Sequence, residues 1–138
     1  MSMAKELHYY LTLNCTGLTT ANTWVNKAPQ TPATGVTIHE AGGSPPTPTF
    51  GSTPTFESPH FQIVARSTLY PTARSLAESV YRKLQTVKTA TLLTSAASTA
   101  STVYLSINPM QAPFPLGEDD AGRYLIACNY ATKKGLSA

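Results

Sequence analysis

The chain has 138 residues, a net charge of +3 and only 12% charged residues, which suits one domain over residues 1–138 with its own hydrophobic core. The basic residues are scattered and no cluster is longer than the pair Lys133 and Lys134, which argues against binding of nucleic acid by charge alone. No window approaches the ~20 apolar residues of a membrane helix and the N-terminus lacks the apolar run of a secretory signal, so we expect a protein that stays in the cytoplasm and contacts no membrane.

The N-terminal part of the chain predicts a helix followed by short strands. Apolar residues with the i, i+3 and i+4 spacing of a helix lie within residues 5–13. Residues 24–25 begin a short strand. Alternation over residues 35–41 predicts a further strand that buries Val36 and Ile38 on one face.

Residues 42–59 predict a Pro/Gly-rich extended loop or arm. Five of these eighteen residues are prolines, and proline fixes φ and removes a backbone donor, which disfavours both a helix and a central strand. A loop of this length inside a compact domain is usually functional or disordered. Phe50 and Phe56 are its candidate anchors on a surface.

A strand and a long helix form the clearest pattern in the chain. Residues 61–66 predict a strand with one apolar face, which is formed by Phe61, Ile63 and Ala65 at every second position. Pro71 suits the first turn of the helix that follows, because its missing N–H costs nothing there. The apolar stripe of this helix, which should pack on the strand, is Ala73, Leu76, Ala77, Val80, Leu84 and Val87.

The C-terminal part predicts two strands joined by a turn-rich loop. Residues 88–102 are rich in threonine, alanine and serine and predict a low-complexity connection, either partly ordered or a short strand and turn. Residues 103–111 and 122–133 read as strands of an antiparallel hairpin with a protruding tip, and residues 134–138 should fray. The face expected on the first strand is Val103, Leu105 and Ile107.

The order of these elements predicts the fold class. Helix, strands, arm, strand, helix and two strands indicate an α+β domain. We expect an antiparallel or mixed β-sheet with two helices packed on it, and a long β-hairpin or extended arm.

The chain carries no clear catalytic or metal-binding motif, so we predict no enzyme, no cofactor and no metal. His39 and Glu40 begin an HExxH pattern, but Gly43 stands where the second histidine belongs. Serine is abundant without the G-x-S-x-G elbow of a hydrolase. Cys15 and Cys128 lack CxxC spacing and are interpreted as reduced core residues, with a disulfide left open.

The acidic run of Glu118, Asp119 and Asp120 is the main candidate for a contact site. It reads either as a solvated hairpin tip, or as a docking contact or an inter-subunit salt bridge to Arg66 or Arg123. The full set of candidate subunit or partner interface residues is Arg66, Glu118, Asp119, Asp120, Arg123, Phe50 and Phe56.

Three stretches together resemble a known family. They are the strand that ends in Arg66, the pattern Y-P-x-A-x-x-L-A-E-x-V-Y-x-x-L over residues 70–84, and P-x-Q-A-P-F-P-L-G-E-D-D-A-G-R-Y from residue 109 onward, followed by N-Y. In this pattern of elements the chain is similar to the minor capsid protein family of tailed bacteriophages, whose members act as tail terminators.

The resemblance implies a structural virion protein that forms a homo-oligomeric ring, expected to be a hexamer. The ring would cap the tail tube, end its polymerisation and offer the head-attachment surface at the head–tail junction, after assembly in the host cytoplasm. Implied partners are further copies of itself, the tail tube protein, the head completion or connector protein, and genomic DNA that passes through the lumen without sequence-specific binding. Family members often carry a basic residue where this chain has Glu118. A head–tail adaptor or tail-completion protein, and a small soluble α+β binding module unrelated to phage, remain the alternatives.

Overall fold

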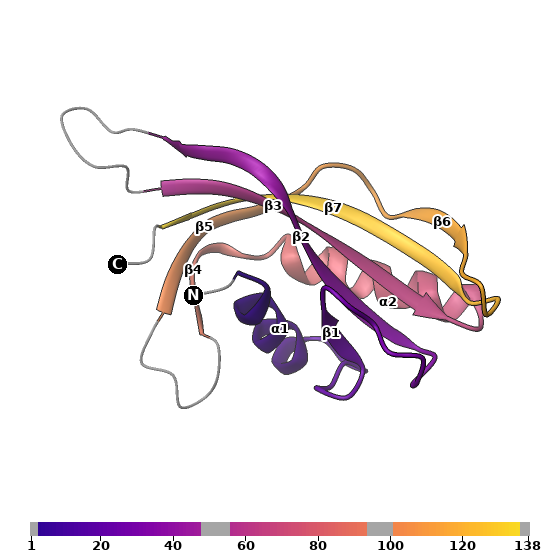
Figure 1. The fold of residues 1–138 in the computed structure, drawn as a ribbon. Coiled ribbons are helices and arrows are strands. Elements are labelled where there is room, and N and C mark those ends of the chain that lie inside the picture. Colours follow the sequence, from indigo (N-terminus) through magenta and orange to yellow (C-terminus); the bar gives the residue numbers. More distant parts are fainter. Residues whose placement is uncertain (1–2, 48–55, 94–100, 136–138) are drawn as a thin grey trace.

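The structure is a computed structural model that describes residues 3–47, 56–93 and 101–135. These residues form two helices and seven strands, and both helices lie on the concave side of one curved sheet (Figure 1). In chain order the elements are α1 (Met3–Asn14), β1 (Thr23–Val25), β2 (Gly35–Thr47), β3 (Phe56–Ser67), α2 (Tyr70–Leu84), β4 (Lys88–Leu93), β5 (Ser101–Pro109), β6 (Phe114–Glu118) and β7 (Tyr124–Gly135). In the described part of the chain, neither helix is long and apolar enough to cross a membrane.

The sheet is mixed, with the strand order β1-β2-β3-β7-β5-β4. β1 runs parallel to β2, and the other pairs of the sheet are antiparallel. β5 and β6 pair with successive parts of the same edge of β7, so β6 lies in line with β5. The predicted α+β fold, with two helices packed on a mixed sheet, is therefore confirmed.

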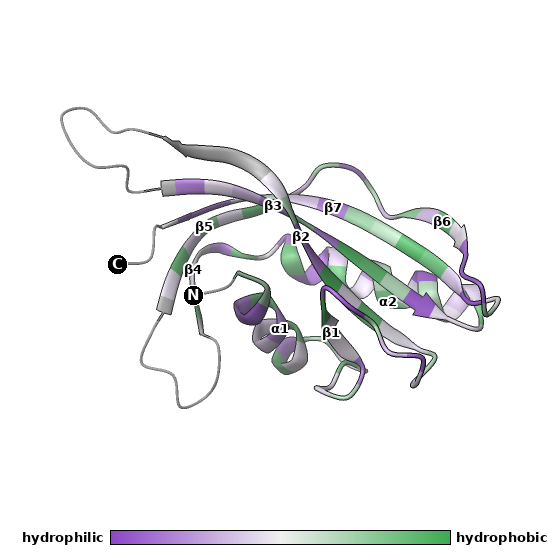
Figure 2. Cartoon of the chain, viewed as in Figure 1, coloured by the Kyte–Doolittle hydropathy of each residue, from purple (hydrophilic) through white to green (hydrophobic). Residues whose placement is uncertain are grey.

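The hydrophobic core lies between the sheet and the helices. In the register of β3 and β7, Phe61 faces Tyr130, Ile63 faces Cys128 and Ala65 faces Ile126. All six are at most 3% exposed, and the Phe61 and Tyr130 rings stack with centroids 4.9 Å apart. The stripe of α2 is buried against this face through Ala73, Ala77, Val80 and Leu84, as predicted. Figure 2 shows the hydrophobic residues of β3 and β7 in the stretch that lies over α2.

The predicted buried face of β5 is wrong. Tyr104 and Ile107 are fully buried, whereas Val103 is 45% exposed. The pairing with β7 shifts register between Tyr104 and Ser106, and a bulge adds one residue to a strand and inverts the alternation beyond it. Because of the bulge, Tyr104 and Ile107 both face the core, although strict alternation would place them on opposite faces of the strand.

The segment expected to be a loop or arm contains the outer ends of β2 and β3. Thr47 pairs with Phe56, and the register shifts between Ala41 and Thr47. β1 pairs with β2 only up to Ile38, so the prolines in the outer part of β2 lie on a sheet edge, where a missing N–H breaks no ladder. Residues 48–55, which include Phe50, lie outside the described residues.

Two further segments contain strand structure, which for residues 88–102 was one of the two expectations. Residues 88–102 contain β4, which pairs with β5 at the edge of the sheet, and residues 94–100 lie outside the described part. β7 continues to Gly135 where fraying was expected. Lys134 is only 4% exposed and its Nζ lies 3.2 Å from Oε1 of the partly exposed Glu57, so an ion pair holds the end of this strand.

Candidate functional site

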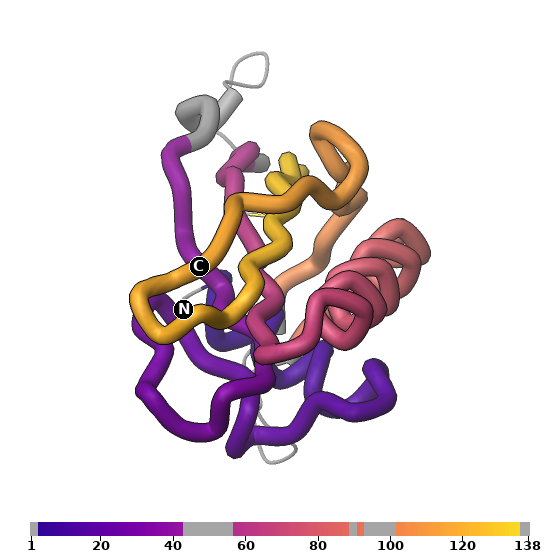
Figure 3. Tube along the Cα trace, turned by 90° about the vertical axis from the view of Figure 1, so that its right-hand side faces the viewer, coloured from indigo at the N-terminus to yellow at the C-terminus, as the bar shows by residue number. Residues whose placement is uncertain are grey.

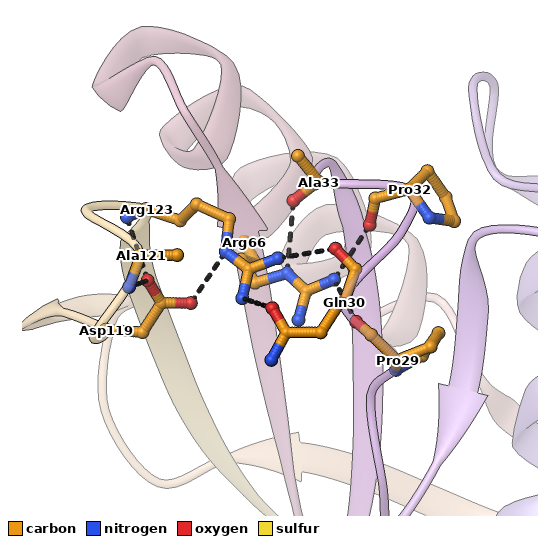
Figure 4. Close-up of polar contacts among 8 residues, drawn as sticks. All are labelled: Pro29, Gln30, Pro32, Ala33, Arg66, Asp119, Ala121 and Arg123. Carbon is orange, nitrogen blue, oxygen red and sulfur yellow. Dashed lines mark hydrogen bonds and ion pairs between the residues drawn. The ribbon is translucent and has the colours of Figure 1, made fainter.

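Two buried arginines meet at the end of the sheet where β3 ends and β7 begins (Figure 4). Arg66 in β3 is 6% exposed, and Arg123, in the turn that leads into β7, is 7% exposed. A buried guanidinium is costly unless its N–H groups find acceptors. Here the acceptors come from the loop between β1 and β2 and from the β6–β7 turn.

Arg66 holds the loop between β1 and β2. Its Nη2 donates to the carbonyl oxygens of Pro29 and Pro32, both at 2.7 Å, and its Nε donates to the carbonyl of Ala33 at 3.1 Å. The guanidinium also stacks over the Trp24 ring, 4.9 Å from its centroid. A proline-containing loop cannot form a regular ladder, and the fork of Arg66 supplies the donors that its carbonyls would otherwise lack.

Gly35 makes room for this arrangement at the first residue of β2. A Cβ at this position would run into the Trp24 ring and the backbone oxygen of Asn22. A glycine is therefore required by close approach, and it lets Trp24 lie against the sheet beneath Arg66.

Arg123 joins the same loop to the β6–β7 turn. Its Nε donates to Asp119 Oδ2 at 2.7 Å, and its Nη1 donates to the backbone oxygen of Gln30 at 2.8 Å. Asp119 Oδ1 accepts the backbone N–H groups of Ala121 and Arg123 at 3.0 and 2.9 Å. Gly122 has a φ of 77°, a left-handed conformation that glycine adopts without strain. Together these bonds make the turn rigid.

The charges of this cluster partly compensate one another. Burial, and then the charge of Arg123, lowers the pKa of Arg66, while Asp119 acts in the opposite direction. The backbone N–H of Arg123, followed by its side chain and the N–H of Ala121, lowers the pKa of Asp119 despite partial desolvation. Glu118 and Asp120 flank the cluster and are exposed.

The cluster borders a depression in the surface. Gln30, Asp119, Asp120, Ala121 and Arg123 line a shallow polar depression of about 290 Å³. Among residues 3–47, 56–93 and 101–135, no group of three His, Cys, Asp or Glu side chains could hold a metal ion. This end of the molecule is the candidate contact site.

The two cysteines lie elsewhere, in the core. Cys15 and Cys128 are free and buried. Burial raises the pKa of both thiols, and for Cys15 the nearby Lys83 offsets part of this increase. Raised pKa values disfavour the reactive thiolate, so neither residue has the character of a nucleophile.

The structure brings most of the predicted interface residues together. Arg66, Asp119 and Arg123 are in one cluster, with Glu118 and Asp120 beside it. The salt bridge hypothesised between subunits forms within one chain, between Asp119 and Arg123.

The two phenylalanines of the predicted set are not part of this cluster. Phe56 is at the opposite end of β3 from Arg66, and Phe50 lies outside the described residues. What the sequence analysis missed is the loop between β1 and β2, above all Gln30 and Trp24. The sequence did contain one indication of this contact: Arg66 ends an apolar strand, and the loop before β2 contains Pro29 and Pro32, whose carbonyl oxygens need donors.

The fold and this cluster define a class: an α+β domain whose helices cover one face of a curved sheet, with a turn and a loop joined by two buried arginines at one end. A family model described as "Bacteriophage tail terminator protein" matches residues 12–134. The chain belongs to the bacteriophage tail terminator family, as the resemblance predicted. It is accordingly a structural component of a phage tail that associates with other virion proteins.

Among the solved structures that match the chain is one of a protein without a descriptive name. It has a TM-score of 0.48 and 12% sequence identity, over 86% of this chain and 81% of that chain. No curated protein matches the chain significantly.

Proposed function

We propose that identical copies of this protein form a ring, expected to be a hexamer, that caps the tail tube, ends its polymerisation and provides the surface to which the head attaches. The observation that carries the proposal is the family match over residues 12–134. The ring lies at the head–tail junction, between the tail tube protein and the head completion or connector protein. Genomic DNA passes through its lumen without sequence-specific contacts.

Two open sheet edges support contacts between copies. In the described residues, β2 has no strand partner on its outer edge beyond Ile38, and β4 ends the sheet on the other side. Unpaired edges are sites where another chain adds hydrogen bonds. Head-to-tail contacts between two different surfaces close into a ring when the rotation between copies closes. The low content of charged residues, 12%, also suits a protein with extensive interfaces.

The acidic turn supports a second contact in this proposal. Arg66 and Arg123 are satisfied inside the chain, which leaves the exposed Glu118 and Asp120 as the side chains that reach a partner. We expect the double variant Glu118→Ala/Asp120→Ala to weaken ring formation in light scattering and the joining of tails to heads. The variant Arg82→Ala, which removes an exposed charge of α2 away from the acidic turn, is the control. Rings and joining equal to those of the control would remove the acidic turn from the interface.

The capping function is tested on tail tubes. Purified protein is mixed with tail tubes, the tips are viewed by negative-stain electron microscopy, and fresh tube protein is then added. We expect ring-shaped density at one tip and no further growth from it. Bare tips that continue to elongate would contradict the proposed function.

A further inference from the structure

An apolar groove lies beside the acidic turn, between the start of α2 and β6. Tyr70, Tyr124, Pro115 and Leu125 are among the residues that line it, and it encloses about 260 Å³. The Tyr70 and Tyr124 rings meet edge to face with centroids 5.7 Å apart. The wall is therefore mainly aromatic and apolar.

A hydrogen bond next to the groove joins α2 to the segment just before β6. Arg74 Nη1 of α2 donates to the backbone oxygen of Pro113, just before β6, at 3.0 Å. Arg74 Nε also lies 3.1 Å from Glu78 Oε1, which holds the guanidinium in place. A groove formed in advance loses less entropy when it binds a segment.

Exposed apolar side chains are neighbours in sequence of the residues that line the groove. Leu69 is 63% exposed and Tyr70 40% exposed at the start of α2, and Leu116 is 50% exposed in β6. Single exposed hydrophobic residues are ordinary, but several beside an apolar groove indicate a docking surface. Such a surface should be covered in the assembled protein.

The chain itself contains a segment whose chemistry fits this groove. Residues 41–56 carry no charged side chain, and they include four prolines and Phe50. Proline-rich segments bind aromatic-lined grooves, because their restricted backbone loses little entropy on docking. The segment belongs to the antiparallel pair of β2 and β3, which is closed by the pairing of Thr47 with Phe56.

The geometry prevents this segment from reaching the groove of its own chain. In β7, Gly135 pairs with Phe56 and Tyr124 pairs with Ser67, so the two ends of β3 are about 36 Å apart at roughly 3.3 Å per residue. Thr47 and Phe56 pair at the far end, and the eight residues that join them are too few to span this distance and return. Figure 1 shows the outer ends of β2 and β3 at one end of the molecule, and β6 with the start of α2 at the other. Figure 3 looks at the second end.

We propose that residues 45–55 of one copy occupy the groove between Tyr70 and Tyr124 of the next copy. Each subunit then donates its β2–β3 hairpin to one neighbour and accepts the hairpin of the other, a head-to-tail contact that closes into a ring. This inference rests on the proposed function, because the ring supplies the neighbour.

Cysteine cross-linking tests the contact. The variants Phe50→Cys and Leu116→Cys are purified separately, mixed, and treated with a short bis-maleimide. The native Cys15 and Cys128 are 7% and 2% exposed and should give little background. We expect a cross-linked dimer in the mixture, and a ladder up to the full ring in the double variant. Val103→Cys, at a position 45% exposed on β5, replaces Leu116→Cys as the control and should give no dimer with Phe50→Cys.

A matched pair of charge variants gives the second readout. Leu116→Asp should raise the concentration needed for ring formation at least tenfold, whereas Val103→Asp should leave it unchanged, with equal thermal unfolding of both confirming the fold. Rings without the cross-link, and with Leu116→Asp assembling normally, would overturn the inference and leave the proposed function standing. Monomers at every concentration, without a cross-link, would overturn both.

Discussion

Arg66 and Arg123 stabilise a stretch of chain that cannot stabilise itself. The loop between β1 and β2 contains Pro29 and Pro32, whose carbonyl oxygens accept from Arg66 at 2.7 Å. Arg123 binds Gln30 of the same loop, 93 positions away in sequence. Arginine is suited to positions 66 and 123 because its guanidinium presents five donors in a planar fork and stays charged when buried. The position of the loop between β1 and β2 thus depends on the two arginine side chains.

The planar fork of Arg66, and not only its charge, should stabilise the fold. We expect Arg66→Lys to lower the free energy of unfolding by about 1.5–3 kcal/mol, because an ammonium keeps the charge but cannot bond three carbonyls at once. Urea unfolding followed by circular dichroism measures this. Arg82→Lys, on the exposed face of α2, is the control and should change little. Equal stability of the two variants would show that the fork of Arg66 is not needed.

The second prediction concerns pH. The pKa of Asp119 is lowered in the folded chain, so its stabilisation is present above the unfolded pKa, near 4, and is lost as the pH falls through the folded value. Asp119→Asn should therefore be less stable than the parent at pH 7, with a difference that shrinks below about pH 4. Urea unfolding at pH 7, 5, 4 and 3 gives the comparison. A difference that stays constant with pH would argue against the charge of Asp119 as the cause.

Polar contacts attach the helix α1 to the sheet. Glu6 of α1 is fully buried, and its Oε1 accepts the hydroxyl of Tyr104 in β5 at 2.9 Å. Burial, followed by the charge of Glu6, raises the pKa of Tyr104, so the phenol remains a donor. The backbone N–H of Ala4 donates to Glu40 Oε1 of β2 at 3.2 Å. The helix is thus fixed by polar contacts in addition to its buried leucines.

We predict that Tyr104→Phe lowers the free energy of unfolding by about 1–3 kcal/mol, because Glu6 would then be buried without its hydroxyl partner. The control is Tyr9→Phe, at a half-buried position of α1, which should lower the free energy of unfolding by less. Thermal unfolding of both variants decides the question. A Tyr104→Phe variant as stable as the control would mean that the carboxylate is satisfied in another way.

The elements that the sequence predicted correctly are those whose signal is local. The alternation around Phe61 and the stripe of α2 each concern one face of one element, and both faces are buried as expected. The prediction of the buried face of β5 was wrong, because the bulge in this strand depends on its pairing with β7. The arginine cluster was not predictable in detail either, since Arg66 and its loop partners are more than 30 positions apart and no local pattern connects them.

At the scale of the whole molecule, the two ends of the sheet differ in chemistry. One end has the outer part of the β2–β3 hairpin, where residues 41–56 carry no charged side chain, and the other has the apolar groove, the acidic turn and the buried arginines. Both helices lie on the concave side, which leaves the ends and edges of the sheet for other chains (Figure 1). A subunit with two different ends is suited to head-to-tail assembly, which is the assembly that a tail-capping ring requires.

The mass of the purified protein in solution tests the ring most directly. Native mass spectrometry over a range of concentrations should show six copies of the 14.7 kDa chain, about 88 kDa, as the dominant species once assembly is complete. Leu116→Asp should shift this species toward the monomer, and Val103→Asp should not. A protein that remains at 14.7 kDa at every concentration would contradict the ring, whereas a closed oligomer of six copies is the result we predict.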